Sequence, residues 1–211
     1  MPPADRIVWI DCEMTGLDPY HDALIEVAVI VTDSNLKPLG EGIDVLIKPS
    51  QEALDDMGDF VRNMHTSSGL LDELATGMTM EEAEAAVLDY VKGFVPEAGK
   101  APLGGNTIGT DKGFLQVNMP ALMDHLHYRM IDVSTIKELS RRWYPRAYFQ
   151  KPKKAGGHRA LADILESIDE LRYYRETVFT SQPGPTSQQA KQAAKRIKET
   201  SVVATTGLSG V

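Results

Sequence analysis

Two acidic residues close to the N-terminus, Asp11 and Glu13, have the type and spacing of metal ligands. They follow the apolar run of residues 7–10, which is typical of a buried strand, and residues two apart on a strand project from one face. Two carboxylates at the edge of a core repel each other and lose hydration, so their burial is unfavourable unless a cation or a proton joins them. The pair predicts a cation site, although an isolated Asp-X-Glu is also common by chance.

A histidine and an aspartate in the C-terminal half, His158 and Asp163, form a second candidate pair. Within one helix a spacing of five residues would place the two side chains about 140° apart around the axis. Gly156 and Gly157 indicate instead that His158 lies in a loop before the helix, from which it reaches the face that carries Asp163. The alternative is an unrelated pair of surface residues.

A third candidate, Asp111, comes shortly after the segment Gly105-Asn106-Thr107. Its carboxylate can add oxygen ligands to the same site. Alternatively, Asp111 serves only as the N-cap of a following helix, because a short acidic side chain accepts hydrogen bonds from the first free N–H groups of a helix.

Hydrophobic patterning predicts strands that position these side chains. Strands are expected over residues 7–13, 24–32 and 42–48, and the short connections between them favour an antiparallel meander. Two further strands are expected over residues 101–106 and 128–133.

Helices are expected where apolar residues recur every three to four positions. The first predicted helix follows Thr79, and Glu82 three residues later completes the pattern of a capping box. The predicted helices cover residues 79–95, 111–125 with a break near Pro120, 134–143 and 159–176.

Composition separates a main domain from a C-terminal segment. The chain has 211 residues, of which 42% are hydrophobic and 25% charged, values that are ordinary for a globular protein. We expect residues 1–180 to form one domain. Residues 181–211 are rich in Ser, Thr, Gln, Ala, Gly and Pro and lack aromatic residues, so we expect a low-complexity, flexible tail with room for a helical turn around 188–198.

The charge and the single cysteine limit the partners and the location. A net charge of −8 excludes a globally basic surface of the kind that holds long duplexes. Positive charge is concentrated between Lys137 and Arg159, where eight basic residues accompany one acidic residue, although this stretch can also be a solvated loop. Cys12 alone allows no internal disulfide. No apolar run is long enough to cross a bilayer and the start lacks a secretion signal, so we expect a cytoplasmic protein without a membrane partner.

Three ordered motifs resemble those of the DEDD exonuclease superfamily, in the branch that carries a histidine. Residues 9–17, which include Asp11 and Glu13, resemble its first motif, residues 105–111 its second, and residues 158–163 its third. Further stretches resemble the oligoribonuclease family over roughly residues 5–178. These stretches are Met64-His65-Thr66-Ser67-Ser68-Gly69-Leu70, His127-Tyr128-Arg129, Asp132-Val133-Ser134-Thr135-Ile136-Lys137-Glu138-Leu139 and Arg142-Trp143.

This resemblance implies an α/β fold of the ribonuclease H-like type, a mixed sheet flanked by helices, over an exonuclease domain of residues 1–180. It implies a homodimer that removes nucleotides from the 3′ ends of short single-stranded RNAs, especially dinucleotides, and releases nucleoside 5′-monophosphates. The alternatives are a 3′-to-5′ DNA exonuclease of the proofreading type and a non-catalytic nucleic-acid-binding dimer.

The resemblance also implies the catalytic set. Oxygen ligands from four acids suit a hard cation, so we expect two Mg²⁺ or Mn²⁺ ions per site. His158 would remove the proton of the attacking water. Histidine suits this role because the pKa of an unperturbed imidazole is about 6.5, close to neutral pH. The predicted metal ligands are Asp11, Glu13, Asp111 and Asp163.

Substrate-binding residues follow from the same resemblance. Thr107, Arg129 and Ser134 match a pocket for the 5′ phosphate, with His65 and Tyr128 contributing around the dimer contact. Arg129 can instead form an interface salt bridge, and Ser134 can be a helix N-cap. Asp132 is expected to cap the following helix and is left outside the catalytic set.

Leu17 and Phe60 match positions that contact the bases, where an aromatic ring offers a stacking face. Core packing is the alternative for both. The family typically has tryptophan where this chain has Phe60, and serine where it has Thr107.

Overall fold

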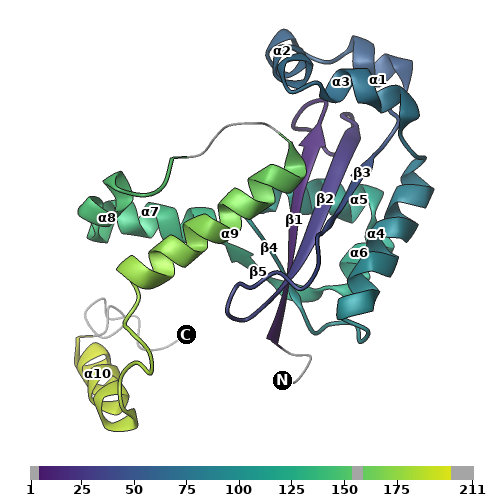
Figure 1. Ribbon diagram of the computed structural model, residues 1–211. Helices are drawn as coiled ribbons and strands as arrows, with labels where there is room; N and C mark the ends of the chain where they lie inside the picture. Colours follow the sequence, from purple (N-terminus) through teal and green to yellow (C-terminus); the bar gives the residue numbers. More distant parts are fainter. Residues whose placement is uncertain (1–4, 154–158, 201–211) are drawn as a thin grey trace, which may run out of the picture.

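A five-stranded mixed sheet forms the centre of the protein in the computed structural model, which describes residues 5–153 and 159–200 (Figure 1). The strand order is β3-β2-β1-β4-β5. The strands are β1 (Arg6–Met14), β2 (Leu24–Asp33), β3 (Ile43–Leu46), β4 (Pro102–Gly105) and β5 (His127–Asp132). β1, β2 and β3 pair in antiparallel fashion, whereas β4 is parallel to β1 and β5 is parallel to β4. The predicted meander and mixed sheet are confirmed.

Helices account for most of the remaining described chain. They are α1 (Gln51–Asp55), α2 (Asp59–Ser67), α3 (Leu70–Glu73), the 3₁₀ turn η2 (Leu74–Thr76), α4 (Met80–Phe94), α5 (Gly109–Asn118), α6 (Pro120–His125), α7 (Val133–Trp143), α8 (Pro145–Phe149), α9 (Ala160–Thr177) and α10 (Ser187–Glu199). The capping box of Thr79 and Glu82 starts α4, and a new helix begins at Pro120, both as predicted. The short helices α1, α2, α3 and α8 were not predicted. None of the helices in the described ranges is long and apolar enough to cross a bilayer.

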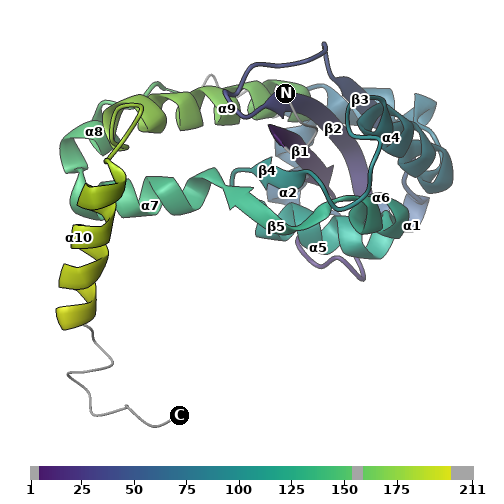
Figure 2. The same ribbon diagram turned by 90° about the horizontal axis from the view of Figure 1, so that it is seen from below.

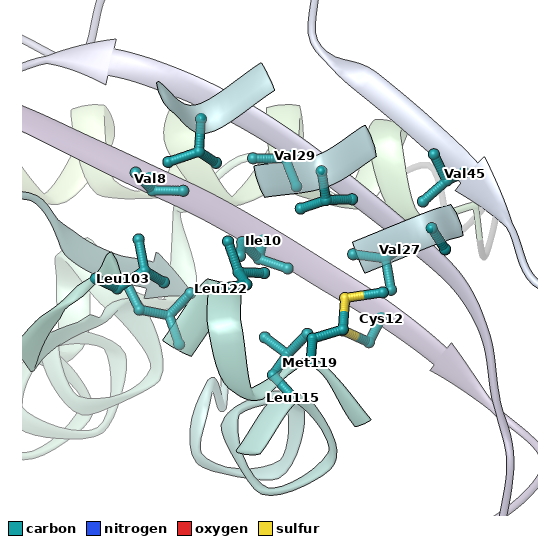
Figure 3. Packing of buried hydrophobic residues seen from close by; sticks show 14 of the residues in the cluster. Val8, Ile10, Cys12, Val27, Val29, Val45, Leu103, Leu115, Met119 and Leu122 are labelled. Atoms are coloured by element: carbon teal, nitrogen blue, oxygen red, sulfur yellow. The ribbon is translucent and has the colours of Figure 1, made fainter. Parts of the chain in front are cut away.

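The two faces of the sheet carry separate cores. Val8, Ile10 and Cys12 of β1 pack with residues of α4, α5 and α6 on one face (Figure 3). Ile7 and Trp9, which alternate with them, pack against α9 on the other face. Because side chains alternate along a strand, Asp11 and Glu13 continue the row of Ile7 and Trp9 and lie on the face of α9. The strand therefore delivers both acids to the same helix.

The C-terminal segment forms more structure than expected. A helix of 13 residues, α10, covers the range 188–198 in which a helical turn was expected. Thr186 and Gln189 form a capping box, and the alanine, lysine and glutamine residues that follow favour helix without needing a core. No α10 residue is buried, and both views show α10 beyond the end of α9, away from the sheet (Figures 1 and 2). The boundary at residue 180 stays a prediction.

Candidate active site

Three acids converge between β1 and the first turn of α9. Asp11, Glu13 and Asp163 each offer a carboxylate oxygen, and these oxygens lie within 4.8 Å of one another. Asp11 and Glu13 come from alternate positions of β1, and Asp163 lies in the first turn of the helix that covers this face. We call these three residues the carboxylate cluster. Segments about 150 residues apart in sequence thus meet as predicted.

Asp111 lies in the first turn of α5, outside the group of three acids whose oxygens lie within 4.8 Å of one another. It is buried, and its Oδ1 accepts a hydrogen bond of 3.0 Å from the backbone N–H of Cys12, the residue between Asp11 and Glu13. Ile108, not Asp111, occupies the N-cap of α5. The interpretation of Asp111 as a helix cap is therefore wrong. Asp111 is instead hydrogen-bonded to β1, the strand that carries Asp11 and Glu13.

Burial makes Glu13 and Asp111 hard to ionise, and neighbouring acids add to the effect. Burial, followed by the nearby charges of Glu26, Asp163 and Asp111, raises the pKa of Glu13 from 4.5 to about 8, with Arg159 opposing the shift. Burial raises the pKa of Asp111 from 3.8 to about 6, although the Cys12 N–H stabilises its charged form. An all-oxygen donor set that resists ionisation on its own fits a divalent cation, which would neutralise the repulsion.

The predicted base, His158, lies outside the described residues. The chain resumes at Arg159, the N-cap residue of α9, four positions before Asp163.

A second group of side chains gathers where β4 and β5 end. The backbone N–H of Thr107 donates to Ser134 Oγ at 2.9 Å and to Asp132 Oδ1 at 3.0 Å, and the Thr107 and Ser134 hydroxyls are 3.0 Å apart. Thr107 has a φ of 55°, a left-handed conformation that these hydrogen bonds hold in place. We call Thr107 and Ser134 the hydroxyl pair. The structure brings them together, and their role in a phosphate pocket stays a prediction.

The capping roles at α7 are assigned by the structure. Asp132 is the N-cap and accepts a hydrogen bond of 2.9 Å from the Ser134 N–H, so its predicted capping role is confirmed. The alternative role of Ser134 as N-cap is wrong. Its hydroxyl instead donates to Asn106 Oδ1 at 3.0 Å.

Arg129 and Tyr128 lie exposed on β5, an edge strand. Arg129 Nε donates to the Tyr128 hydroxyl at 3.1 Å, and the guanidinium carbon is 5.5 Å from the centre of the tyrosine ring. The two predicted pocket residues therefore form one exposed unit. Whether Arg129 meets phosphate or an interface carboxylate stays a prediction.

Leu17 and Phe60 are both exposed, at 79% and 80%. Leu17 lies in the turn after β1, and Phe60 lies in the first turn of α2. Core packing, the alternative for both residues, is wrong. Their exposure leaves both free to contact a base.

His65 lies in the interior of the protein, next to the carboxylate cluster. It is fully buried in α2, where its Nε2–H donates to the Met14 carbonyl oxygen at 2.9 Å and its Nδ1 lies 3.9 Å from Glu13 Oε2. The helix α2, which was not predicted, carries His65 to the end of β1. The predicted contribution of His65 around a dimer contact stays a prediction. His65 thus supports the backbone next to Glu13.

Sequence reasoning missed Glu26 and the importance of Arg159. Glu26 is completely buried on β2, directly opposite Glu13, and Arg159 Nε donates to Glu26 Oε1 at 2.9 Å. A signal was present, because Glu26 interrupts an otherwise apolar strand, and a charge in that position is rarely buried without a partner.

Comparisons with known proteins agree with this geometry. The family model described as Exonuclease (RNase_T) matches residues 8–171. Oligoribonuclease from Streptomyces avermitilis is 63% identical over 192 residues, which cover 91% of this chain and 96% of that protein. The chain belongs to the oligoribonuclease family. The oligoribonuclease of Cutibacterium acnes is 60% identical over 190 residues, covering 90% of this chain and 94% of that protein.

Solved structures place the fold. Exonuclease I from Methylocaldum szegediense is similar with a TM-score of 0.61 and 19% identity, over 82% of this chain and 41% of that one. A complex of Escherichia coli exonuclease I with single-stranded DNA gives a TM-score of 0.62 and 15% identity, over 82% and 40%. This chain spans about two fifths of the length of these structures. The fold is of the ribonuclease H-like exonuclease type, as the resemblance implied.

Proposed function

We propose that this chain is a 3′-to-5′ exoribonuclease that degrades short oligoribonucleotides, especially dinucleotides, to nucleoside 5′-monophosphates. The observation that carries the proposal is the convergence of Asp11, Glu13 and Asp163 within 4.8 Å, in a chain 58–63% identical to proteins named oligoribonuclease.

The carboxylate cluster and Asp111 would hold two divalent cations, Mg²⁺ or Mn²⁺. Such ions, when bound, neutralise the charge that builds on the reacting phosphate and orient the attacking water and the leaving 3′ oxygen. The protein's own part is to hold the four acids rigidly. Cys12 fixes Asp111, and α9 fixes Asp163 over β1.

His158 is the proposed acceptor of the water's proton. It precedes α9 by two positions in the sequence, close to Asp163 along the chain. Histidine is the side chain whose ordinary pKa lies nearest to neutral pH, which suits a general base.

Selection of short substrates would depend on Arg129 and the hydroxyl pair. Arg129 and the hydroxyl pair would bind a 5′ phosphate, with the planar guanidinium supplying charge and geometry. A diribonucleotide has one linking phosphate to place at the carboxylate cluster and one 5′ phosphate to place here, so both ends are held at once. Leu17 and Phe60 would contact the bases, and Tyr128 would contribute near the contact of a homodimer. His65 as a substrate contact and the cytoplasm as the location stay predictions.

The test is product analysis with synthetic RNAs of two to twenty nucleotides, labelled at the 5′ end, with and without a metal chelator. We expect the diribonucleotide to be hydrolysed fastest, monophosphates to leave from the 3′ end, and the chelator to stop the reaction. Faster hydrolysis of a matching deoxy-dinucleotide would favour a DNA exonuclease. Turnover that is unaffected by the chelator would contradict the metal site.

A further inference from the structure

A buried carboxylate that the proposed chemistry does not use lies directly beside the carboxylate cluster. Glu26 of β2 is the ladder partner of Glu13 on β1 and is completely buried. Directly opposed residues of an antiparallel pair project from the same face, so both side chains point toward α9. An acid in this position adds repulsion to a site that is already crowded with negative charge, and it needs compensation.

The start of α9 supplies that compensation. Glu26 Oε1 accepts a hydrogen bond of 2.9 Å from Arg159 Nε, and Oε2 accepts one of 3.2 Å from the Ala160 backbone N–H. Arg159 is the N-cap of α9, and its own side chain forms no capping hydrogen bond. A carboxylate from the neighbouring strand therefore takes the capping role, and it also meets the positive end of the helix dipole.

Arg159 extends the connection to a third segment. Its two terminal nitrogens donate to both oxygens of Glu73, at the end of α3, at 3.1 Å each. One guanidinium thus links β2, α3 and α9. A bidentate arginine–carboxylate contact fixes direction as well as distance, which an ammonium group does not.

The consequence falls on Asp163, one turn into α9. The first turn of a helix is where fraying begins, because its N–H groups lack partners within the helix. Asp163 also lies within 4.8 Å of the Glu13 and Asp11 oxygens, and its charge disfavours ionisation of Glu13. We propose that Glu26 and Arg159 form a positioning clamp, which holds the first turn of α9 against β1 and so keeps the Asp163 oxygen within reach of the other two acids.

This clamp rests on the proposed function, in which the cluster binds divalent cations, and it makes a distinct prediction. Neither residue contacts substrate in this account. Loss of the clamp should therefore weaken cation binding and turnover while leaving the Michaelis constant for substrate nearly unchanged. A purely structural pair would lower the thermal midpoint without changing the cation affinity of the molecules that remain folded.

The experiment compares Arg159→Ala, Arg159→Lys and Glu26→Gln with the wild-type protein. Mn²⁺ binding is measured by calorimetry without substrate, and kcat and KM are measured on a 5′-phosphorylated diribonucleotide. We expect Arg159→Ala to weaken Mn²⁺ binding by about 10- to 100-fold and to lower kcat to a similar degree, with KM changed less than about twofold. Arg159→Lys should give a smaller loss. Glu26→Gln should also lose affinity, because its amide NH₂ would face either the guanidinium or the Ala160 N–H, and both are donors.

Three further measurements separate the clamp from general destabilisation. Arg172→Ala removes an exposed arginine of the same helix, paired with Asp169 at 2.7 Å, and should leave Mn²⁺ affinity unchanged. Free guanidinium ion at non-denaturing concentration should restore part of the Mn²⁺ affinity of Arg159→Ala, and sodium chloride at equal ionic strength should not. The double variant with Glu26→Gln should be no weaker in binding than Arg159→Ala alone, since residues that act as a unit are not additive.

The outcomes are distinct. Wild-type Mn²⁺ affinity and kcat in Arg159→Ala would overturn the clamp, and so would an equal loss in Arg172→Ala. If Arg159→Ala does not fold, Arg159→Lys and Glu26→Gln decide by the same measurements. A wild-type protein that binds Mn²⁺ but hydrolyses no RNA would overturn the proposed function, while the affinity comparison would still decide the clamp.

Discussion

The carboxylate cluster and the hydroxyl pair both lie near strand ends of the same sheet but are held in opposite ways. Around the hydroxyl pair, each contact is attractive: Ser134 donates to Asn106, and Asn106 accepts in turn from Lys137 Nζ at 3.2 Å. Lys137 also pairs with buried Glu170 at 3.1 Å. In the carboxylate cluster the acids repel one another, and the pKa of Glu13 rises to about 8.

This difference shows which side chains of the site are stabilised by the protein alone and which need a bound cation. A hydrogen-bond network whose donors and acceptors are satisfied is preorganised. Binding of a ligand then costs little further side-chain entropy. A group of buried like charges is strained until a cation arrives. Substitutions in the two regions should therefore have different signatures.

The strongest test of the carboxylate side is Asp163→Asn. We expect kcat to fall about a thousandfold, because a charged ligand of the reacting centre is lost. The metal-free variant should unfold at the same or a higher temperature than the wild type, since one repelling charge has gone. Steady-state kinetics and thermal unfolding measure the two effects.

The matched control for that variant is Asp169→Asn, which changes an exposed aspartate of the same helix. It should retain wild-type turnover. Wild-type turnover in Asp163→Asn, or a drop in its metal-free stability, would contradict the description of the cluster as strained.

The hydroxyl side is tested most strongly by Arg129→Ala. Hydrogen bonds to charged groups contribute about 1.5–3 kcal/mol, so KM for a 5′-phosphorylated diribonucleotide should rise about 10- to 100-fold, with little change in kcat. The same variant should behave like wild type on a diribonucleotide without the 5′ phosphate. Arg141→Ala, an exposed arginine of α7 paired with Glu138, serves as control. An equal loss on both substrates would show that Arg129 does not read the phosphate.

Base contact gives a smaller effect. Phe60→Ala should weaken binding of a diribonucleotide by about 1–3 kcal/mol, and Phe60→Trp should strengthen it, because a larger ring stacks better. The ring is 80% exposed, so neither change should move the thermal midpoint appreciably. Competition binding with an inactive background variant measures this. Unaltered affinity in Phe60→Ala would remove the residue from the substrate site.

The mildest perturbation is pH. The folded protein raises the pKa of Glu13 from 4.5 to about 8 and that of Asp111 from 3.8 to about 6. The folded state thus holds more protons than the unfolded state between about pH 4 and pH 8, and the stability from these groups is lost as pH rises through that window. Metal-free protein should therefore lose thermal stability from pH 5 to pH 8.

Added Mg²⁺ should raise the midpoint more at pH 8 than at pH 5, since cations bind the ionised acids. Thermal unfolding with and without Mg²⁺ across this range measures the difference. An equal increment at both pH values would contradict the raised pKa values.

The sequence pattern predicted those parts of the site that depend only on residues close together in the chain. Alternation along β1 places Asp11 and Glu13 on one face, and Pro120 starts a new helix after α5. These outcomes depend on neighbouring residues and on the fixed periods of strands and helices. They could be derived before any long-range contact was known.

The parts that were missed depend on contacts between distant segments. Glu26 and Arg159 are 133 residues apart in sequence, and His65 reaches Met14 across 51 residues. No period along the chain encodes which buried acid meets which arginine. The position of His65 depends on α2, which lies at the end of β1. Because α2 is short and has few apolar residues, the sequence gave little indication of this helix.

The central claim is that the carboxylate cluster and Asp111 bind divalent cations as one centre. The most direct measurement is anomalous X-ray scattering from crystals grown with Mn²⁺. The account predicts two manganese peaks, bounded by Asp11, Glu13, Asp111 and Asp163, that vanish in Asp163→Asn crystals or weaken greatly. Manganese that binds elsewhere, or peaks that persist unchanged in that variant, would contradict it.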